Sequence, residues 1–271
     1  MNWPTFHHEA MATTFQIIVA GRPPDYAGQA AAAAFRELDR LENELSRFLD
    51  TSEISRVNRL KAGESIILGE DALQCLLGAV QISALTRRAF DPAYATRRPA
   101  GTDEPLFALD PSRHALTSLT ERLHLDLGAV GKGYALDVMA HVLAEWDISS
   151  ACLQSGGSTV LALAAPSDAA GWPIGVADDI HLFAGRAVSG SGLAVQGEHL
   201  IDPRSRAPAA RTRRVWSFAG SAADSDALST AFFVMSDESV VEFCQQHPEY
   251  GAALTLPDGS TRYLGTTGSR V

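Results

Sequence analysis

At the centre of the chain stands Leu125-Asp126-Leu127-Gly128-Ala129-Val130-Gly131-Lys132-Gly133-Tyr134-Ala135. The alternating apolar residues of 123–127 predict a strand, and the segment 134–145 predicts a helix. The glycine-rich turn 128–133 joins them, and a turn that opens a helix can offer its backbone N–H groups to a phosphate. Its glycine spacing matches neither a P-loop nor a Rossmann fingerprint. By itself the turn therefore indicates either a phosphate contact or simply a tight connection between a strand and a helix.

Outward from this turn, helical and strand patterns are mixed along the chain. Apolar residues spaced by three and four, together with helix-favouring composition, predict helices at 27–48, 70–88, 134–145, 224–235 and 238–247, with a short capped turn at 52–58. Strand patterns occur at 11–21, 65–68, 123–127, 152–164 (interrupted at Gly156-Gly157), 172–177, 181–183, 186–189, 215–219, 252–256 and 262–264. The segment 90–122 carries loop signals. Because no regular βαβ alternation is present, we expect an α+β fold of one domain spanning 1–271, with mixed, mostly antiparallel sheets flanked by helices.

The composition limits the possible ligands and locations. The chain of 271 residues is 46% hydrophobic and carries a formal net charge of −10. That charge argues against general nucleic-acid binding, and any phosphate-bearing ligand would need a local cation, a basic side chain or a helix N-terminus. No stretch approaches the ~18–20 apolar residues of a membrane span, and the N-terminal residues resemble neither a signal peptide nor a lipobox. We expect a cytoplasmic protein without membrane insertion, and three buried thiols: Cys75, Cys152 and Cys244.

A hard-oxygen pair stands on the predicted helix 224–235. Asp226 and Thr230 are four residues apart, so their side-chain oxygens project from one helix face. A carboxylate and a hydroxyl suit Mg²⁺, which usually completes its shell with waters and substrate phosphates. The alternative is structural: Asp226 caps the helix and Thr230 bonds a backbone carbonyl.

A candidate general base lies in Glu198-His199-Leu200-Ile201-Asp202-Pro203. His199 can exchange a proton near neutral pH, and its place beside an Asp-Pro turn suits a strand end. The alternative is an ordinary surface histidine, one of eight in the chain.

These signals belong to a larger ordered set of segments. The set comprises Met11-Ala12-Thr13-Thr14-Phe15, Ser46-Arg47-Phe48 with the segment 52–58, Ala89-Phe90-Asp91-Pro92, the central stretch 125–135, Ser191-Gly192, the segment 199–204 and Asp226-Ala227-Leu228-Ser229-Thr230. In this order the segments resemble those of the ApbE-type FAD:protein FMN transferases. The Lys-Gly-Tyr, His-x-Ile-Asp-Pro and Asp-Ala-Leu-x-Thr segments are the most specific, and the resemblance extends from near the first residue to past residue 230.

The resemblance implies an ApbE-like fold that holds FAD in a cleft between two interleaved lobes. Such enzymes transfer the FMN half of FAD to a Thr or Ser hydroxyl of a target protein, often a redox protein, and release AMP. By the same resemblance, Mg²⁺ would be held by Asp226, Thr230 and the backbone carbonyl of Ala129, and His199 would be the catalytic base. The implied FAD-binding residues are Met11, Phe48, Ala89, Phe90, Asp91, Asp126, Lys132 and Leu200.

The chain also departs from the family pattern. It has Gly156-Gly157-Ser158 where Gly-Gly-Asn is usual, Gly190-Ser191-Gly192 where Thr-Ser-Gly is frequent, and no Gly-Pro in the segment 93–98. Two alternative functions therefore stay open at this point. One is a flavin-binding or flavin-trafficking protein that transfers nothing, and the other is a Mg²⁺-dependent FAD pyrophosphatase in which water replaces the acceptor.

Overall fold

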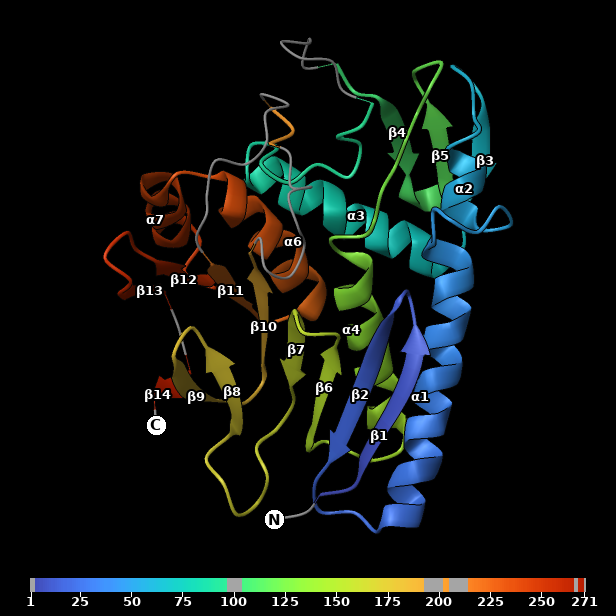
Figure 1. The fold of residues 1–271 in the computed structure, drawn as a ribbon. Coiled ribbons are helices and arrows are strands. Elements are labelled where there is room, and N and C mark those ends of the chain that lie inside the picture. The colour runs from blue at the N-terminus through green and yellow to red at the C-terminus, as the bar shows by residue number, and fades with distance from the viewer. Residues whose placement is uncertain (1–2, 97–103, 193–201, 205–213, 266–267, 271) are drawn as a thin grey trace.

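Three antiparallel sheets form the framework of the chain (Figure 1). The computed structural model describes residues 3–96, 104–192, 202–204, 214–265 and 268–270. The main sheet has the strand order β1 (Thr5–Ala10), β2 (Thr13–Val19), β6 (Ala151–Ser155), β7 (Thr159–Ala162), β10 (Arg186–Ser191), β11 (Val215–Ala219), β12 (Gly251–Thr255) and β13 (Thr261–Leu264). The smaller sheets have the orders β14 (Ser269–Arg270), β9 (Asp179–Phe183), β8 (Trp172–Val176) and β3 (Ser65–Ile67), β5 (Ala115–Ser118), β4 (Phe107–Asp110).

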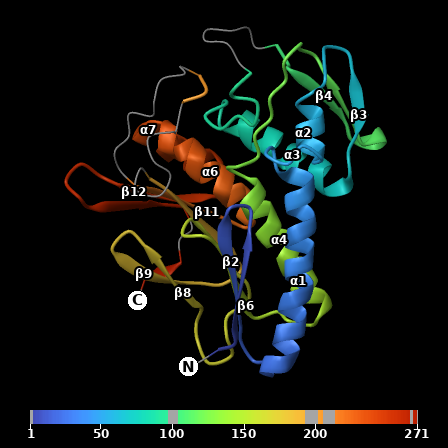
Figure 2. The same cartoon turned by 45° about the vertical axis from the view of Figure 1, so that its right-hand side comes forward.

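Helices cover one face of the main sheet (Figures 1 and 2). The helices with the main contacts to its strands are α1 (Pro24–Leu45), α4 (Gly131–Glu145), α6 (Ala222–Val234) and α7 (Asp237–Gln246). The helix α2 (Glu53–Val57) packs on α1, α3 (Glu70–Leu85) packs on α1 and α6, and a 3₁₀ turn, η1 (Pro111–Arg113), joins β4 to β5. Every ladder between described strands is antiparallel. The predicted α+β class with antiparallel sheets flanked by helices is therefore confirmed.

The two faces of the main sheet bury different side chains because successive strand residues point to opposite sides. Phe15 and Ile17 of β2 face the helices and join the larger hydrophobic core with Leu38 of α1. A second, smaller core on the other face contains Phe218 of β11 and Trp172 of β8. The helices α4 and α6 pack on the first face, and their N-terminal ends carry the candidate site.

The predicted strand at 123–127 is not present. Leu123, Leu125 and Leu127 are buried, so every second residue of the segment is buried, as in a strand. However, the Asn58 side chain occupies both backbone groups of Leu125: its Nδ2 donates to the Leu125 carbonyl at 2.9 Å, and its Oδ1 accepts from the Leu125 N–H at 2.6 Å. An amide side chain thus replaces the neighbouring strand, so the segment stays irregular.

Four of the described strands were not predicted: β1, β4, β5 and the two-residue β14. The N-terminal strand β1 pairs with β2, and the turn between them is formed by Met11 and Ala12, whose φ angles are 49° and 58°. Met11 therefore lies in a turn, not at the start of a strand. The strands β4 and β5 lie in the segment expected to be loops, where each has only four residues. Such short strands carry too few alternations to stand out in the sequence.

Candidate functional site

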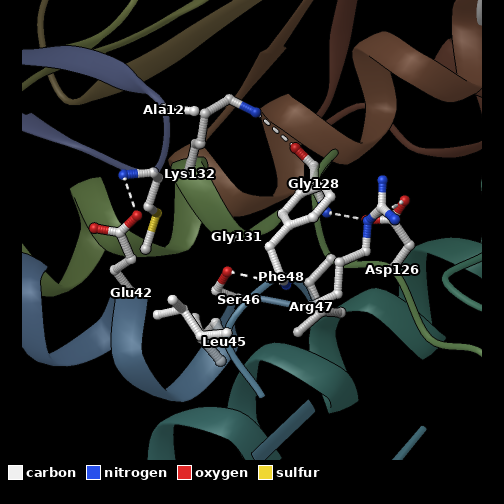
Figure 3. A pocket seen from close by; sticks show the side chains of 13 residues that line it. Ala12, Glu42, Leu45, Ser46, Arg47, Phe48, Asp126, Gly128, Gly131 and Lys132 are labelled. Atoms are coloured by element: carbon white, nitrogen blue, oxygen red, sulfur yellow. Dashed lines mark hydrogen bonds and ion pairs between the residues drawn. The ribbon is translucent and has the colours of Figure 1, made fainter. Parts of the chain in front are cut away.

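A pocket of about 360 Å³ opens beside the N-terminal end of α4 (Figure 3). Its walls come from the turn between β1 and β2, the C-terminal end of α1, the segment 46–49 and the turn that leads into α4. The lining residues are Met11, Ala12, Glu42, Leu45, Ser46, Arg47, Phe48, Leu49, Asp126, Leu127, Gly128, Gly131 and Lys132. Four residues expected to bind FAD are therefore brought together here: Met11, Phe48, Asp126 and Lys132.

An aromatic ring and an ion pair form one side of the pocket. The extended backbone of Ser46 ends α1 and leads the chain into Arg47 and Phe48. The Phe48 residue is 78% exposed, although an aromatic side chain gains from burial. The Arg47 guanidinium carbon lies 4.2 Å from the centre of the Phe48 ring, and Arg47 Nε lies 3.2 Å from Asp126 Oδ2. This arrangement holds a flat apolar surface open toward the pocket (Figure 3).

The glycine-rich turn supplies the positive side of the pocket. Lys132 Nζ donates to the carbonyl of Gly128 at 2.6 Å, and the Gly128 N–H donates to Asp126 Oδ1 at 2.9 Å. An ammonium group has three donors, so Lys132 retains capacity for a ligand oxygen. The N-cap residue of α4, Val130, makes no side-chain cap bond, and the N–H groups of Val130 and Gly131 donate to the carbonyl of Leu127 at 3.1 and 2.7 Å. The Lys132 ammonium and the positive end of the α4 dipole together favour an anion at this end of the pocket.

Asp226 lies directly behind this turn. Only 2% of the residue is exposed. The backbone N–H of Gly133, the residue after Lys132, donates to Asp226 Oδ2 at 3.3 Å. The Thr159 hydroxyl lies 3.2 Å from Asp226 Oδ1. The Asp226 carboxylate is therefore held at the N-terminus of α4, immediately next to the pocket wall.

The contact between α4 and α6 requires glycine at position 133. A Cβ there would lie 2.2 Å from the carbonyl oxygen of Ala222. Because that neighbour is a backbone atom, it cannot move aside as a flexible side chain could. The other two residues expected to bind Mg²⁺ are both partly buried: Thr230, one turn after Asp226, and Ala129, which precedes α4. Gly133 therefore permits the close approach of α4 and α6 on which the position of Asp226 depends.

Some predicted residues lie outside the pocket wall. Ala89, Phe90 and Asp91 are at most 5% exposed and are absent from the described lining. The carbonyl of the next residue, Pro92, accepts from the Asp126 N–H at 2.8 Å and connects this segment to the pocket wall.

His199 and Leu200 lie outside the described residues. Of their segment, Asp202 and Arg204 are described: Arg204 Nε and Nη2 each donate to the Asp202 carboxylate at 2.9 Å. Arg204 Nη2 also donates to the carbonyl of Val234, the last residue of α6, at 3.3 Å. This attaches the Asp-Pro-Arg turn to the C-terminal end of the helix that carries Asp226 and Thr230.

Several residues at the site were not predicted from the sequence. Glu42 accepts a hydrogen bond from the Met11 N–H at 2.8 Å and so supports the β1–β2 turn. Arg47 was part of a recognised segment, but nothing in the sequence indicated its pairing with Asp126. The hydroxyls of Thr159 and Ser189 contact Asp226 from two strands. The sequence feature that could have identified Thr159 and Ser189 is a polar residue at a position where the strand alternation predicts a buried side chain.

The departure at Gly190 has a structural explanation. Gly190 of β10 pairs with Trp216 of β11, and a Cβ at position 190 would lie 3.0 Å from Trp216 Nε1. The indole thus occupies space that a threonine side chain would need. Both residues lie on the sheet face that points away from the helices, so this departure leaves the surroundings of Asp226 unchanged.

The described residues contain no group of three or more His, Cys, Asp or Glu side chains arranged to hold a metal. A metal site in this part of the chain would have to use hydroxyl, carbonyl or ligand oxygens beside a single carboxylate. The three cysteines are free and buried, as predicted. No helix among the described residues has the length and apolar character needed to cross a membrane.

Comparison with known proteins matches nearly the whole chain to one family. The model of the ApbE family matches residues 11–254. The FAD:protein FMN transferase of Treponema pallidum (strain Nichols) is 24% identical over 298 aligned residues, covering 90% of this chain and 82% of that protein.

Solved structures share the fold over almost their full length. The flavin transferase ApbE from Vibrio cholerae has a TM-score of 0.82 at 21% identity, covering 99% of this chain and 98% of that one. The apo form of the Pseudomonas stutzeri flavinyl transferase ApbE has a TM-score of 0.80 at 21% identity, covering 97% and 95%. The ApbE protein of Thermotoga maritima has a TM-score of 0.80 at 23% identity, covering 96% of both chains. The predicted ApbE-like fold is therefore confirmed.

Proposed function

The chain belongs to the ApbE family, and from this premise we propose that it is an FAD:protein FMN transferase working as one domain. The enzyme transfers the FMN half of FAD to a Thr or Ser hydroxyl of a target protein and releases AMP. One observation carries the proposal: the Gly133 N–H bonds Asp226 while its neighbour Lys132 lines the pocket. A buried carboxylate, a basic side chain and a helix N-terminus thus meet at one point, which suits a pyrophosphate with its cation.

Asp226, Thr230 and the Ala129 carbonyl are the proposed Mg²⁺ ligands. The donor chemistry fits, because all three are oxygens and Mg²⁺ commonly keeps only a few protein ligands. Burial of Asp226 at 2% exposure also fits, since among the described residues no Lys, Arg or His forms an ion pair with it. When bound, the metal would supply charge neutralisation for the pyrophosphate and for the departing AMP.

The flavin end of FAD is proposed to lie against Phe48 and Met11, with Asp126 and Lys132 toward the phosphates. The exposed Phe48 face suits stacking with a flat isoalloxazine ring. Leu200 and the segment of Ala89, Phe90 and Asp91 are proposed to complete the FAD site, and the Pro92–Asp126 hydrogen bond connects that segment to the pocket wall.

The transfer step balances without an external oxidant or reductant. The acceptor hydroxyl oxygen bonds to the phosphorus of the FMN half, and the phosphoanhydride bond to AMP breaks. The hydroxyl proton passes to His199, which is proposed to act as the general base. Lys132 stabilises negative charge on the phosphate oxygens. Positioning and charge neutralisation therefore account for most of the expected acceleration.

The acceptor is proposed to be a redox protein with an accessible Thr or Ser, consistent with the role of a flavin as an electron carrier. A cytoplasmic location also stays a prediction, and fractionation of cells that express the chain would test it.

The function is tested by incubating purified protein with FAD, Mg²⁺ and an acceptor that bears a Thr-containing target segment. Acceptor mass and free AMP are measured together. We expect an FMN-sized mass gain matched by AMP release, and neither in EDTA. AMP and free FMN without acceptor modification, in the presence of an accepted target, would favour a pyrophosphatase. Bound FAD with no AMP would favour a flavin-binding protein.

Two variants separate the proposed roles in the same assay. Asp226→Ala should abolish Mg²⁺-dependent turnover, and unchanged turnover would contradict the metal assignment. His199→Ala should retain FAD binding while transfer slows by about 10²–10⁴-fold, the usual contribution of a general base. Normal transfer by that variant would contradict the base assignment.

A further inference from the structure

The carboxylate of Asp226 is surrounded by hydrogen-bond donors that carry no charge. Besides the Gly133 N–H at Oδ2, the Thr159 hydroxyl lies 3.2 Å and the Ser189 hydroxyl 3.5 Å from Oδ1. A buried carboxylate normally needs a charged partner or several hydrogen bonds to remain ionised. Here all the donors are uncharged, so they orient the two carboxylate oxygens without placing a positive charge beside them.

These donors belong to a larger hydroxyl cluster between the main sheet and α6. All members are at most 2% exposed, and they are Thr159, Ser189, Ser191, Ser217, Ser225 and Ser229. The strand members alternate on the sheet face that points toward the helices, as the buried Leu161, Ala187 and Val215 of the same strands do. Burying this many polar side chains is costly unless each one is hydrogen bonded.

The distances define two short chains of hydrogen bonds that end on Asp226. In the first, the Ser189 and Thr159 hydroxyls lie 2.9 Å apart, and Thr159 donates to Asp226 Oδ1 at 3.2 Å. With the Thr159 proton on Asp226, Ser189 is the donor to Thr159, and this is shorter than its contacts to Ser229 at 3.3 Å and to Asp226 at 3.5 Å. In the second, Ser229 donates to the backbone carbonyl of Asp226 at 2.9 Å, which leaves Ser191 as the donor to Ser229 across their 2.9 Å contact. Each hydroxyl then donates once, as its single proton requires. One chain orients the carboxylate, and the other bonds the backbone of the same residue.

We infer that Thr159 and Ser189 are positioning residues for the metal-binding carboxylate of Asp226. This inference rests on the proposed function, since it concerns the same metal site. Thr159 fixes the rotation of the carboxylate, and Ser189 orients the Thr159 hydroxyl. Every carboxylate oxygen retains lone-pair capacity for a metal beyond these bonds. Residues that orient a metal ligand in this way commonly change metal affinity by about 10–100-fold when they are removed.

The test measures Mg²⁺ binding, not turnover. Calorimetric titration with Mg²⁺ alone is performed on wild-type protein, Thr159→Val, Ser189→Ala and Asp226→Ala. Thr159→Val preserves side-chain volume and removes only the hydroxyl. We expect the dissociation constant to rise about 10-fold for Thr159→Val, less for Ser189→Ala, and binding to be lost in Asp226→Ala.

Two further variants exclude a general loss of structure. Ser217→Ala removes an equally buried hydroxyl that bonds the Ser225 carbonyl and does not touch the Asp226 carboxylate. Its Mg²⁺ affinity should stay within about twofold of wild type. Thr159→Ser restores the hydroxyl and should recover most of the affinity. Stability without metal is measured for all variants by urea unfolding, and Thr159→Val and Ser217→Ala are expected to lose similar amounts.

The outcomes separate this inference from the function on which it rests. Wild-type affinity in Thr159→Val and Ser189→Ala, with binding lost in Asp226→Ala, would overturn the inference alone. An affinity loss in Ser217→Ala as large as in Thr159→Val would also overturn it, because the effect would then reflect general packing. Unchanged binding in Asp226→Ala would overturn the metal assignment itself.

Discussion

At the scale of single residues, Phe48 is exposed although it is aromatic. Its ring is held by the Arg47 guanidinium on one side, and Arg47 is held in turn by Asp126. Because the residue is 78% exposed, Phe48 contributes little to the core and its substitution should leave folding intact. The side chain is therefore free to serve a ligand.

Phe48→Ala is expected to weaken FAD binding about 10-fold, because stacking of two aromatic surfaces contributes on the order of 1 kcal/mol beyond simple burial. The measurement is quenching of FAD fluorescence during titration with protein. Ile67→Ala is the matched control, since Ile67 is also exposed, at 65%, but lies on β3 away from the pocket wall. Equal affinity of Phe48→Ala and wild type would contradict the flavin placement.

At the scale of elements, the pair α4 and α6 carries the site. Gly133 allows the two helices to approach until its Cβ position is 2.2 Å from the Ala222 carbonyl oxygen. Asp137, one turn further along α4, accepts the N–H groups of Ala222 and Ala223 at 2.8 Å each. It thereby caps the N-terminus of α6 from a neighbouring helix. These contacts fix the position of α6 along α4 and hence that of Asp226.

Gly133→Ala should destabilise the protein by about 1–3 kcal/mol, the usual cost of forcing extra atoms into a packed interior. It should also weaken Mg²⁺ binding, because α6 must move away from α4. Urea unfolding and Mg²⁺ titration provide the two measurements.

Gly78→Ala is the control for this change. Gly78 lies inside α3, and a Cβ there would meet nothing within 4 Å. Alanine should therefore be neutral or stabilise the helix by about 0.5–1 kcal/mol. A Gly133→Ala variant with wild-type stability and metal affinity would show that the close helix contact is dispensable.

Asp137 should make stability depend on pH. Burial, aided by the nearby charge of Asp224, raises the pKa of Asp137 from 3.8 to about 6, although two N–H donors oppose the shift. Between these values the folded state binds more protons than the unfolded state, so this group favours folding as the pH falls from about 6 toward 4. Above pH 6 the buried charge offsets part of the stability, by about 1–3 kcal/mol.

The measurement compares wild type with Asp137→Asn from pH 4 to pH 7. Asparagine does not titrate, so the wild type should lose stability relative to the variant as the pH rises through this range. A constant difference between the two unfolding free energies, or one of the opposite sign, would contradict the raised pKa. Carbon-13 NMR of the Asp137 carboxyl would locate the titration directly.

At the scale of the whole molecule, the cysteines report on global unfolding. They lie on α3, β6 and α7, and all three are buried. Burial raises the pKa of Cys152 to about 12 and that of Cys244 to about 11, and it raises the pKa of Cys75 further. Thiolate is the reactive form, so the native protein should be almost inert to thiol reagents.

Labelling with a disulfide reagent at pH 8 should therefore modify fewer than one thiol in the native protein over minutes and all three in denaturant. FAD with Mg²⁺ should slow labelling further, because a ligand that binds only the native state lowers the unfolded population. An apo protein whose thiols react rapidly without denaturant would show that one of these regions opens locally.

Much of the framework was predictable because it is encoded by local periodicity. The apolar spacing of α1 and the alternation of β2 are complete within one segment, so neither depends on distant partners. The false strand at 123–127 shows the limit of that reasoning. Its alternating leucines are buried as in a strand, but Asn58, 67 residues earlier in numbering, takes the hydrogen bonds that a neighbouring strand would have made.

The residue types and their order along the chain already indicated the chemistry, since a basic glycine-rich turn, an Asp-Pro turn and a hard-oxygen helix pair follow one another as in one family. Their meeting in space was not readable in advance. Gly133 and Asp226 are 93 residues apart, and Thr159 is 67 residues from Asp226. Local patterns specify which face of an element is buried, but the pairing and offset of distant elements depend on how all of them pack together. Packing alone therefore determined that an uncharged hydroxyl cluster surrounds Asp226 and that Arg47 pairs with Asp126 beside Phe48.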